Sequence, residues 1–84
     1  MCGIAKSVRS VHGVDGGVLL DWKRGQMFYV NPIGSRILNL LNVGFDEAEM
    51  ADAISEEYGA DPALVREHVH SFLEQLRQHG VIEA

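Results

Sequence analysis

Several residue types and patterns are scarce in this 84-residue sequence, and each shortage excludes a class of protein. A single cysteine, Cys2, excludes an internal disulfide and favours the cytoplasm as the compartment. No apolar run approaches the ~20 residues that a membrane-spanning helix needs, and no secretory signal segment is visible. The sequence has only 7 basic residues and 12 acidic ones. The resulting net charge of −5 argues against a nucleic-acid partner.

Signals for chemistry are also scarce. His68 and His70 lie two apart on an expected helix, so they diverge and cannot share a metal ion. The acidic residues between positions 46 and 57 fit a solvated helix face, and no phosphate-binding glycine loop occurs. Cys2 could act as an N-terminal nucleophile, as in class II glutamine amidotransferases, but those enzymes need a far larger fold. We therefore expect a free thiol, no metal and no cofactor.

The length and the 46% hydrophobic content predict one globular domain over residues 1–84. A chain of this size buries only ~60–65% of the surface that it exposes when unfolded. The core is therefore modest, and a binding surface is easier to build than a deep catalytic cleft.

Strand signals occupy the first third of the chain, about residues 7–31. Two apolar runs, Val18–Trp22 and Met27–Val30, flank a Lys23-Arg24-Gly25 turn and predict an antiparallel hairpin. A weaker strand is expected over residues 6–12, and Asp15-Gly16-Gly17 is typical of a turn.

The alternation of side chains predicts which strand faces are buried. If Asp21 points to water, then Val18, Leu20 and Trp22 should lie on the buried face. In the second strand, Phe28 and Val30 share one face, expected to be buried, and Met27 and Tyr29 share the other.

Three helices should follow, at about residues 32–42, 47–58 and 62–79. Their starts are Asn31-Pro32, Asp46 with Glu49 in a capping box, and Asp61-Pro62; their stops are Gly44, Gly59 and Gly80. The expected core stripes are Ile33, Ile37, Leu40 and Leu41; Met50, Ile54 and Tyr58; and Val65, Val69, Phe72 and Leu76. Strands followed by helices predict an α+β domain whose sheet is covered by the helices, with a winged-helix-like bundle.

The third helix carries two flanks beside its core stripe. Arg66, His70, Leu73 and Arg77 form one strip, in which cationic groups surround a leucine that we expect to be exposed. This strip could hold an acidic, partly apolar peptide beside the open edge of the Met27–Val30 strand, or it could be an ordinary solvated flank. The competing flank consists of Leu64, His68, Gln75 and His79.

An ordered set of motifs runs through most of the chain: Gly17-Val18-Leu19-Leu20-Asp21, the Gly25 turn, Phe28, Val30-Asn31-Pro32-x-Gly34-x-x-Ile37-x-x-Leu40-Leu41, Met50-Ala51-x-x-Ile54, Tyr58 and Phe72-Leu73-x-x-Leu76-x-x-x-Gly80-Val81-Ile82. This set resembles the family of PQQ-biosynthesis protein D (PqqD), the stand-alone recognition domains of ribosomal peptide modification pathways. The resemblance covers about residues 7–83 and leaves out Met1–Lys6.

The resemblance implies a three-stranded antiparallel sheet packed on a three-helix winged-helix-like bundle, without catalysis of its own. Such domains bind the leader of a precursor peptide as an added strand beside the third strand and against the third helix. They present it to a modifying enzyme, which in the namesake pathway is a radical S-adenosylmethionine enzyme. The corresponding peptide-binding residues here are Gln26, Met27, Phe28, Tyr29, Val30, Arg66, His70, Leu73 and Arg77.

Two other functions remain open at this point. The three-helix pattern could belong to a winged-helix DNA-binding regulator, although the third helix sets Arg66 and Arg77 against Glu67 and Glu74. An unpaired strand edge could also pair with its own copy and make a homodimer. No membrane partner is expected.

Overall fold

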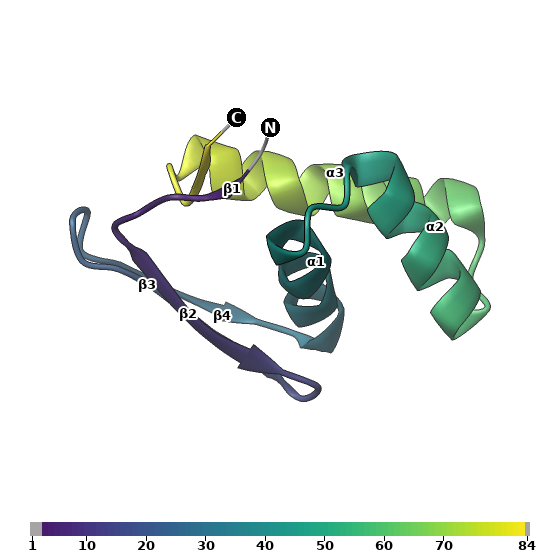
Figure 1. Ribbon diagram of the computed structural model, residues 1–84, viewed down its shortest axis with the longest axis horizontal. Coiled ribbons are helices and arrows are strands. Elements are labelled where there is room, and N and C mark those ends of the chain that lie inside the picture. The colour runs from purple at the N-terminus through teal and green to yellow at the C-terminus, as the bar shows by residue number, and fades with distance from the viewer. Residues whose placement is uncertain (1–2, 84) are drawn as a thin grey trace.

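The structure is a computed structural model that describes residues 3–83, and it has the expected α+β architecture (Figure 1). The elements are β1 Gly3–Ile4, β2 Val8–Gly13, β3 Gly16–Asp21, β4 Gln26–Val30, α1 Pro32–Asn42, α2 Glu47–Tyr58, α3 Pro62–Gln78 and β5 Ile82–Glu83. The predicted three-stranded antiparallel sheet is confirmed, in the order β2-β3-β4. In the described range, none of the helices has both the length and the apolar character needed to cross a membrane.

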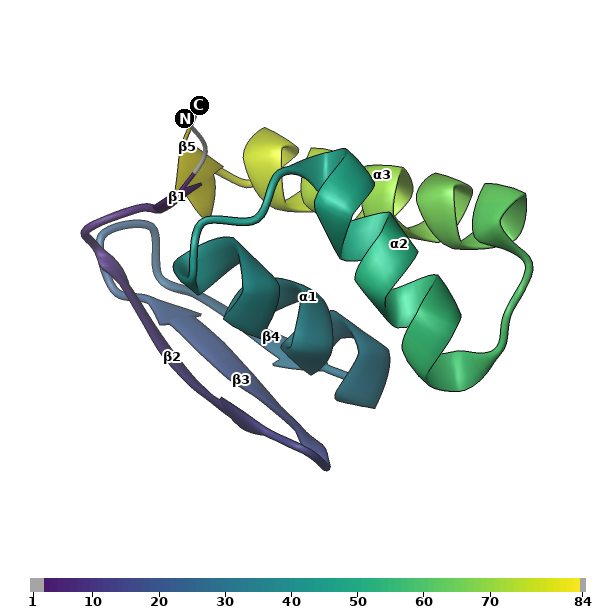
Figure 2. The same ribbon diagram turned by 45° about the vertical axis from the view of Figure 1, so that its right-hand side comes forward.

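The first helix is the centre of the fold. Figure 1 and Figure 2 show α1 between the sheet on one side and the α2–α3 pair on the other. Its buried side chains Ile37, Leu38, Leu40 and Leu41 therefore join the sheet residue Leu19 to the helical residues behind it. No described helix covers the opposite face of the sheet, which is open in both views.

The two ends of the described chain pair with each other, which the sequence analysis did not predict. β1 and β5 form a short antiparallel sheet with Gly3 opposite Glu83 and Ile4 opposite Ile82, and Figure 2 shows the two ends together. The Ala5 N–H donates to the Val81 carbonyl at 2.8 Å. The prediction of a free, frayed thiol at Cys2 lies outside the described residues.

The hairpin register corrects the predicted buried face of β3. Leu19 lies opposite Phe28 and has no exposed surface, whereas Leu20 lies opposite Met27 and is 44% exposed. Trp22 is exposed and Val18 is only half-buried, while Asp21 is completely buried. The prediction failed because it assumed a solvated Asp21.

The neighbouring strand keeps its predicted alternation. Phe28 and Val30 are half-buried and pack against the core, while Met27 and Tyr29 are exposed on the other face. Because β3 and β4 are paired residue for residue, the correct faces of β4 also fix those of β3.

The helix starts agree with the sequence. The Asn31 side chain accepts the Gly34 N–H at 2.7 Å, and Asp46 and Glu49 form the predicted capping box. Asp61 caps α3 by accepting the Ala63 N–H at 3.0 Å. One predicted core residue of α2 is wrong, because Tyr58 in its last turn is exposed.

The buried stripe of α3 is rotated relative to the prediction. Val65, Val69 and Leu76 are buried as expected, but Leu73 is buried with them at 2% exposure and Phe72 is only partly buried. The expected exposed leucine is therefore wrong. Leu73 lines the same small depression as Leu41 and Met50, so the packing of α1 and α2 draws it inward.

Candidate functional site

The open edge of β4 is the first component of the candidate site. β4 pairs with β3 on one side, and no strand in residues 3–83 pairs with its other side. An unpaired edge presents a row of backbone N–H and C=O groups that can accept another extended chain. β4 stays short and straight because the Lys23-Arg24-Gly25 turn starts it and Asn31-Pro32 ends it.

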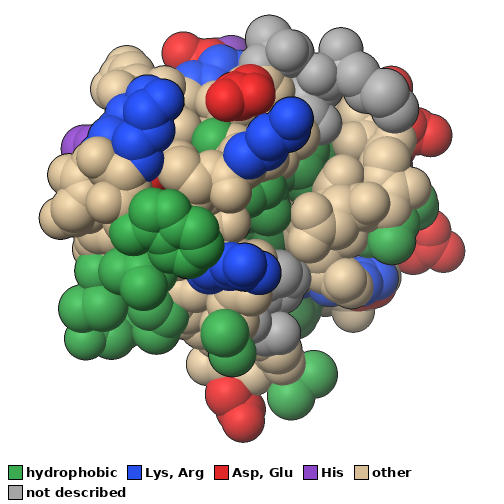
Figure 3. All heavy atoms as spheres, turned by 60° about the vertical axis from the view of Figure 1, so that its left-hand side comes forward, with side chains coloured by type: hydrophobic (Ala, Val, Ile, Leu, Met, Phe, Trp, Pro, Cys, Tyr) green, Lys and Arg blue, Asp and Glu red, His purple; other side chains and the backbone are tan. Residues whose placement is uncertain are grey.

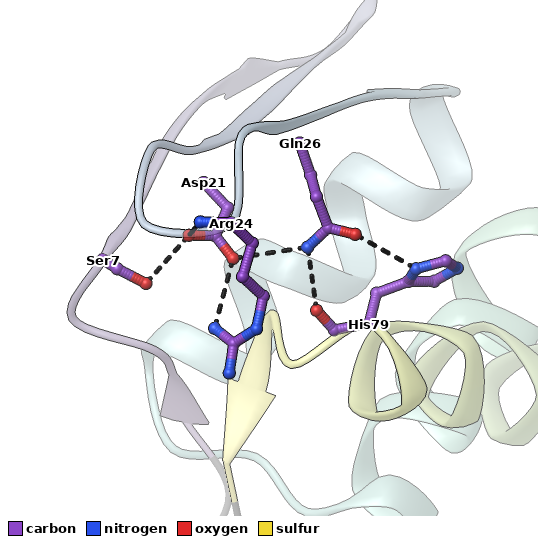
Figure 4. Close-up of polar contacts among 5 residues, drawn as sticks. All are labelled: Ser7, Asp21, Arg24, Gln26 and His79. Carbon is purple, nitrogen blue, oxygen red and sulfur yellow. Dashed lines mark hydrogen bonds and ion pairs between the residues drawn. The ribbon is translucent and has the colours of Figure 1, made fainter.

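The end of α3 lies against the beginning of β4. The Gln26 side-chain amide donates to the His79 carbonyl at 2.9 Å, and its oxygen lies 3.2 Å from the His79 Nδ1 atom (Figure 4). The Phe28 and His79 rings also meet, with centroids 5.1 Å apart. The helix and the strand edge are therefore neighbours at this end.

The start of α3 lies near the residues that follow β4. Asn31 and Ile33 line a mostly apolar depression of about 340 Å³ together with Leu64 and His68, and Ile54 and Tyr58 in the second half of α2 form another of its walls. Between the two ends, Phe72 packs so closely on Gly34 that an added Cβ at Gly34 would lie 3.0 Å from its ring. We call the open edge of β4 together with the α3 flank Leu64, His68, Phe72 and His79 the β4–α3 site.

The predicted strip on α3 lies on the other flank. His70 Nδ1 lies 2.9 Å from a carboxylate oxygen of Glu47 at the start of α2, and Arg66 lines the same depression as this pair. Arg77 pairs with Glu74 on its own helix, and Leu73 is buried. The structure therefore does not bring Arg66, His70, Leu73 and Arg77 to the β4 edge. Of the competing flank, His79 contacts β4, and Leu64 and His68 line the depression beside Asn31 and Ile33, just after that strand.

A buried carboxylate holds the beginning of β4 in place. Asp21 accepts hydrogen bonds from the Ser7 hydroxyl at 3.0 Å, the Arg24 N–H at 3.3 Å, the Arg24 guanidinium at 3.4 Å and the Gln26 amide at 3.4 Å (Figure 4). Burial acts to raise the pKa of Asp21, but the hydrogen bonds from Ser7, Arg24 and Gln26 outweigh it and hold that pKa below its ordinary value.

This network also explains how Gln26 reaches α3. The same amide nitrogen that bonds to Asp21 bonds to the His79 carbonyl, so the hairpin turn and the helix end share one donor. Sequence reasoning missed the network. The sequence did contain an indication of it. Asp21 lies two residues after Leu19, so the two side chains point to the same face of β3, and Leu19 belongs to the core.

The predicted β4 residues contribute to the site in two ways. Phe28 and Val30 point toward the core, and Met27 and Tyr29 point to the solvent on the sheet's outer side. Along this edge it is therefore the backbone of Gln26–Val30, rather than its side chains, that is available for pairing with an added strand. No group of three or more His, Cys, Asp or Glu in the described residues could hold a metal ion.

Comparisons with known proteins find a matching family and several similar structures. The family described as "Coenzyme PQQ synthesis protein D (PqqD)" matches residues 16–82. No curated protein matches the chain. A solved structure described as TbiB1 in complex with the TbiA(beta) leader peptide is 35% identical, with a TM-score of 0.90 over 98% of this chain and 95% of that one.

Two further structures share the fold. A lasso peptide synthetase B1 complexed with the leader peptide is 19% identical, with a TM-score of 0.89 over 99% of this chain and 98% of that one. The PqqD truncation of Methylobacterium extorquens PqqCD, described as a stand-alone recognition element for ribosomally synthesized and post-translationally modified peptides, is 22% identical, with a TM-score of 0.80 over 99% and 88%. With the family matched over residues 16–82, the chain belongs to the family of coenzyme PQQ synthesis protein D (PqqD).

Proposed function

We propose that this protein is a peptide chaperone of ribosomal peptide biosynthesis. It binds the leader of a precursor peptide by β-augmentation and presents that precursor to a modifying enzyme. The observation that carries the proposal is the unpaired edge of β4 beside α3. Membership of the PqqD family supports it, as do the leader peptides in the TbiB1 and lasso synthetase structures.

In such a site the backbone and the side chains contribute differently to binding. Backbone hydrogen bonds along Gln26–Val30 supply affinity without reading the leader sequence, and side-chain pockets supply specificity. The depression beside Leu64 and His68 is mostly apolar, so it suits an aliphatic or aromatic leader side chain. The partly buried Phe72 lies further along the same flank.

The site residues proposed here differ from the sequence expectation on α3. The Gln26–Val30 segment is kept, acting mainly through its backbone. On the helix we propose the flank of Leu64, His68, Phe72 and His79, because it adjoins β4 and the residues after it. We do not propose the strip that the sequence favoured, because its expected role depended on lying beside β4. That strip consists of Arg66, His70, Leu73 and Arg77.

Backbone N-methylation of the leader tests β-augmentation directly. In an added strand, the N–H groups of alternate residues point toward the partner strand and the others point away. Two leader peptides, methylated at odd or at even positions of the bound segment, should therefore behave differently. We expect calorimetry to show that one set loses most of its affinity and the other keeps it. Equal losses, or none, would refute an added strand.

A DNA-binding regulator is not supported. On α3, Arg66 and Arg77 are balanced by Glu67 and Glu74, and Arg77 already pairs with Glu74. Helices and connecting segments from position 32 onward carry ten acidic residues against Arg36, Arg66 and Arg77, which repels a phosphate backbone.

The finer expectations concern partners. We propose a radical S-adenosylmethionine enzyme as the modifying enzyme, a cytoplasmic location and no catalysis by this chain. An iron–sulfur absorbance spectrum in the enzyme that modifies the precursor would support its assignment as a radical S-adenosylmethionine enzyme. A homodimer through the β4 edge would compete with the leader, so light scattering with and without leader peptide tests it.

A further inference from the structure

The uncovered face of the sheet carries a continuous row of exposed apolar side chains. The alternation of the strands places Val11, Leu20, Met27, Tyr29 and the half-buried Val18 on this side. Trp22 follows β3 and lies beside Arg9 of the same side, and we call these six apolar residues the outer sheet face. Val11 and Tyr29 are both 79% exposed and flank Val18 in one cross-strand row. Leu20 and Met27 form the next row.

Such a face is unusual for a soluble domain. Exposed apolar residues are ordinary when scattered, but a contiguous patch marks an interaction surface or an aggregation hazard. The composition is that of an interface core, because aromatic residues, Met and Arg are enriched there. The arginine of this face is Arg9, whose guanidinium carbon lies 5.3 Å from the Trp22 ring centroid.

Charge around the face gives the chemistry of its partner. Residues 1–31 carry four basic side chains against Asp15 and the buried Asp21. Arg9 lies on the face itself, Lys6 and Lys23 are exposed in the turns that adjoin β2 and β3, and Arg24 is paired with Asp21. The rest of the chain holds ten of the twelve acidic residues. In Figure 3 the left-hand side of Figure 1, where the sheet lies, comes forward, and Lys and Arg side chains are seen beside hydrophobic ones. This distribution attracts a surface that is apolar at its centre and acidic at its rim.

The face is also continuous with the site of the leader. A strand added to β4 extends the same sheet, and every second side chain of that strand points to the outer side, next to Met27 and Tyr29. A protein docked on the outer sheet face would therefore touch the bound leader and the chaperone at once. That arrangement is what presentation of a precursor requires.

We infer that the outer sheet face is the docking surface for the modifying enzyme, an inference that rests on the proposed leader-binding function. The enzyme's docking patch is apolar and bordered by carboxylates that face Arg9 and its basic neighbours. A second copy of this chain fits less well, because face-to-face pairing sets the same basic groups against each other.

The test uses the full chain, its leader peptide and the purified enzyme that modifies the corresponding precursor. The variant Val11→Thr/Leu20→Thr changes strands β2 and β3 and leaves the β4 edge untouched. Val43→Thr is the matched control, because Val43 is 65% exposed and lies just after α1, away from the sheet. Arg9→Glu tests the charge. Leader affinity is measured by calorimetry, and enzyme affinity by interferometry at saturating leader.

We expect the double variant to lose at least tenfold in enzyme affinity, while its leader affinity and melting temperature match those of Val43→Thr. Arg9→Glu should slow association with the enzyme, and added salt should shrink that effect. Unchanged enzyme affinity in the double variant would overturn the inference, as would a wild-type dimer that the double variant abolishes. If the enzyme binds as expected but the leader does not bind, the docking surface stands and the proposed function fails.

Discussion

Phe28 in β4 and His79 at the C-terminal cap of α3 meet ring to ring, 5.1 Å apart at an interplanar angle of 59°. The contact joins residues that lie 51 positions apart in the sequence, and it decides which flank of α3 adjoins the strand edge. With the helix turned this way, Leu64 and His68 lie beside Asn31 and Ile33, the residues that follow β4, whereas Arg66 and His70 lie beside Glu47 at the start of α2.

The two flanks of α3 should respond differently to matched substitutions. Leu64→Ala removes apolar surface that a leader side chain would bury, at a cost of ~1–2 kcal/mol of binding free energy, or about 5- to 30-fold in affinity. Arg66→Ala, also at an exposed position early in the helix, should change the affinity less than about twofold. Calorimetry with the leader peptide measures both.

The same comparison is available one turn further along. His68→Ala should weaken the leader complex, while His70→Ala should only remove an exposed pair with Glu47, which contributes ~0.2–1 kcal/mol to stability at most. Larger losses for Arg66→Ala and His70→Ala than for Leu64→Ala and His68→Ala would return the site to the strip that the sequence favoured.

Adjacent leucines in β3 test the strand register. Leu19→Ala empties a fully buried position and should lower the free energy of unfolding by ~2–5 kcal/mol. Leu20→Ala trims a side chain that is 44% exposed and should cost less than about 1 kcal/mol. Urea unfolding gives both values. A reversed order would mean that the strand faces are the opposite of those described.

Local signals explain why the helices could be predicted. Asn31, Asp46 and Asp61 each accept a backbone N–H within their own first turn, so a few neighbouring residues contain the whole signal. The αL glycine Gly59, with φ of 61°, ends α2 in the same local manner.

The misassigned features depend on partners far away in the sequence. Asp21 is buried because Ser7 and Gln26 hydrogen-bond to it, and no alternation rule within β3 contains them. The face of α3 that adjoins β4 follows from long-range contacts such as that of Phe28 with His79. The β1–β5 pair likewise joins the two ends of the chain. Residues that lie directly opposite each other in a hairpin share a face, and Leu19 lies opposite Phe28. Because the face of Phe28 was predicted correctly, this pairing could have corrected the predicted buried face of β3.

The lowered pKa of Asp21 predicts an acid-sensitive component of stability. Because this pKa lies below its unfolded value, near 3.8, the contribution is fully present above that value and is lost as the pH falls through the folded pKa. Asp21→Asn should therefore be less stable than wild type at pH 7, and the difference should shrink in acid. Urea unfolding across pH 2–7 measures it, and a difference independent of pH would contradict the ionised network.

The capping box of α2 offers a change in stability that is separate from binding. Asp46→Ala removes the acceptor for the Glu49 N–H, at 2.8 Å, and should cost ~0.5–2 kcal/mol in unfolding free energy. Its leader affinity should equal that of wild type, because Asp46 caps the start of α2 and does not line the depression, which α2 reaches only with Ile54 and Tyr58. A parallel loss of affinity would show that the leader contacts α2.

The most direct test of the account is an NMR titration of the labelled protein with its leader peptide. If the leader adds to β4, new backbone hydrogen bonds form only along that strand, so the amides of Gln26–Val30 and of the α3 flank at Leu64, His68 and Phe72 should shift most. Those of Glu47–Ala53 in α2, which do not line the depression, should stay close to their free positions. Largest shifts in α2, or in the strip of Arg66 and His70, with β4 unchanged, would contradict leader binding at the β4 edge.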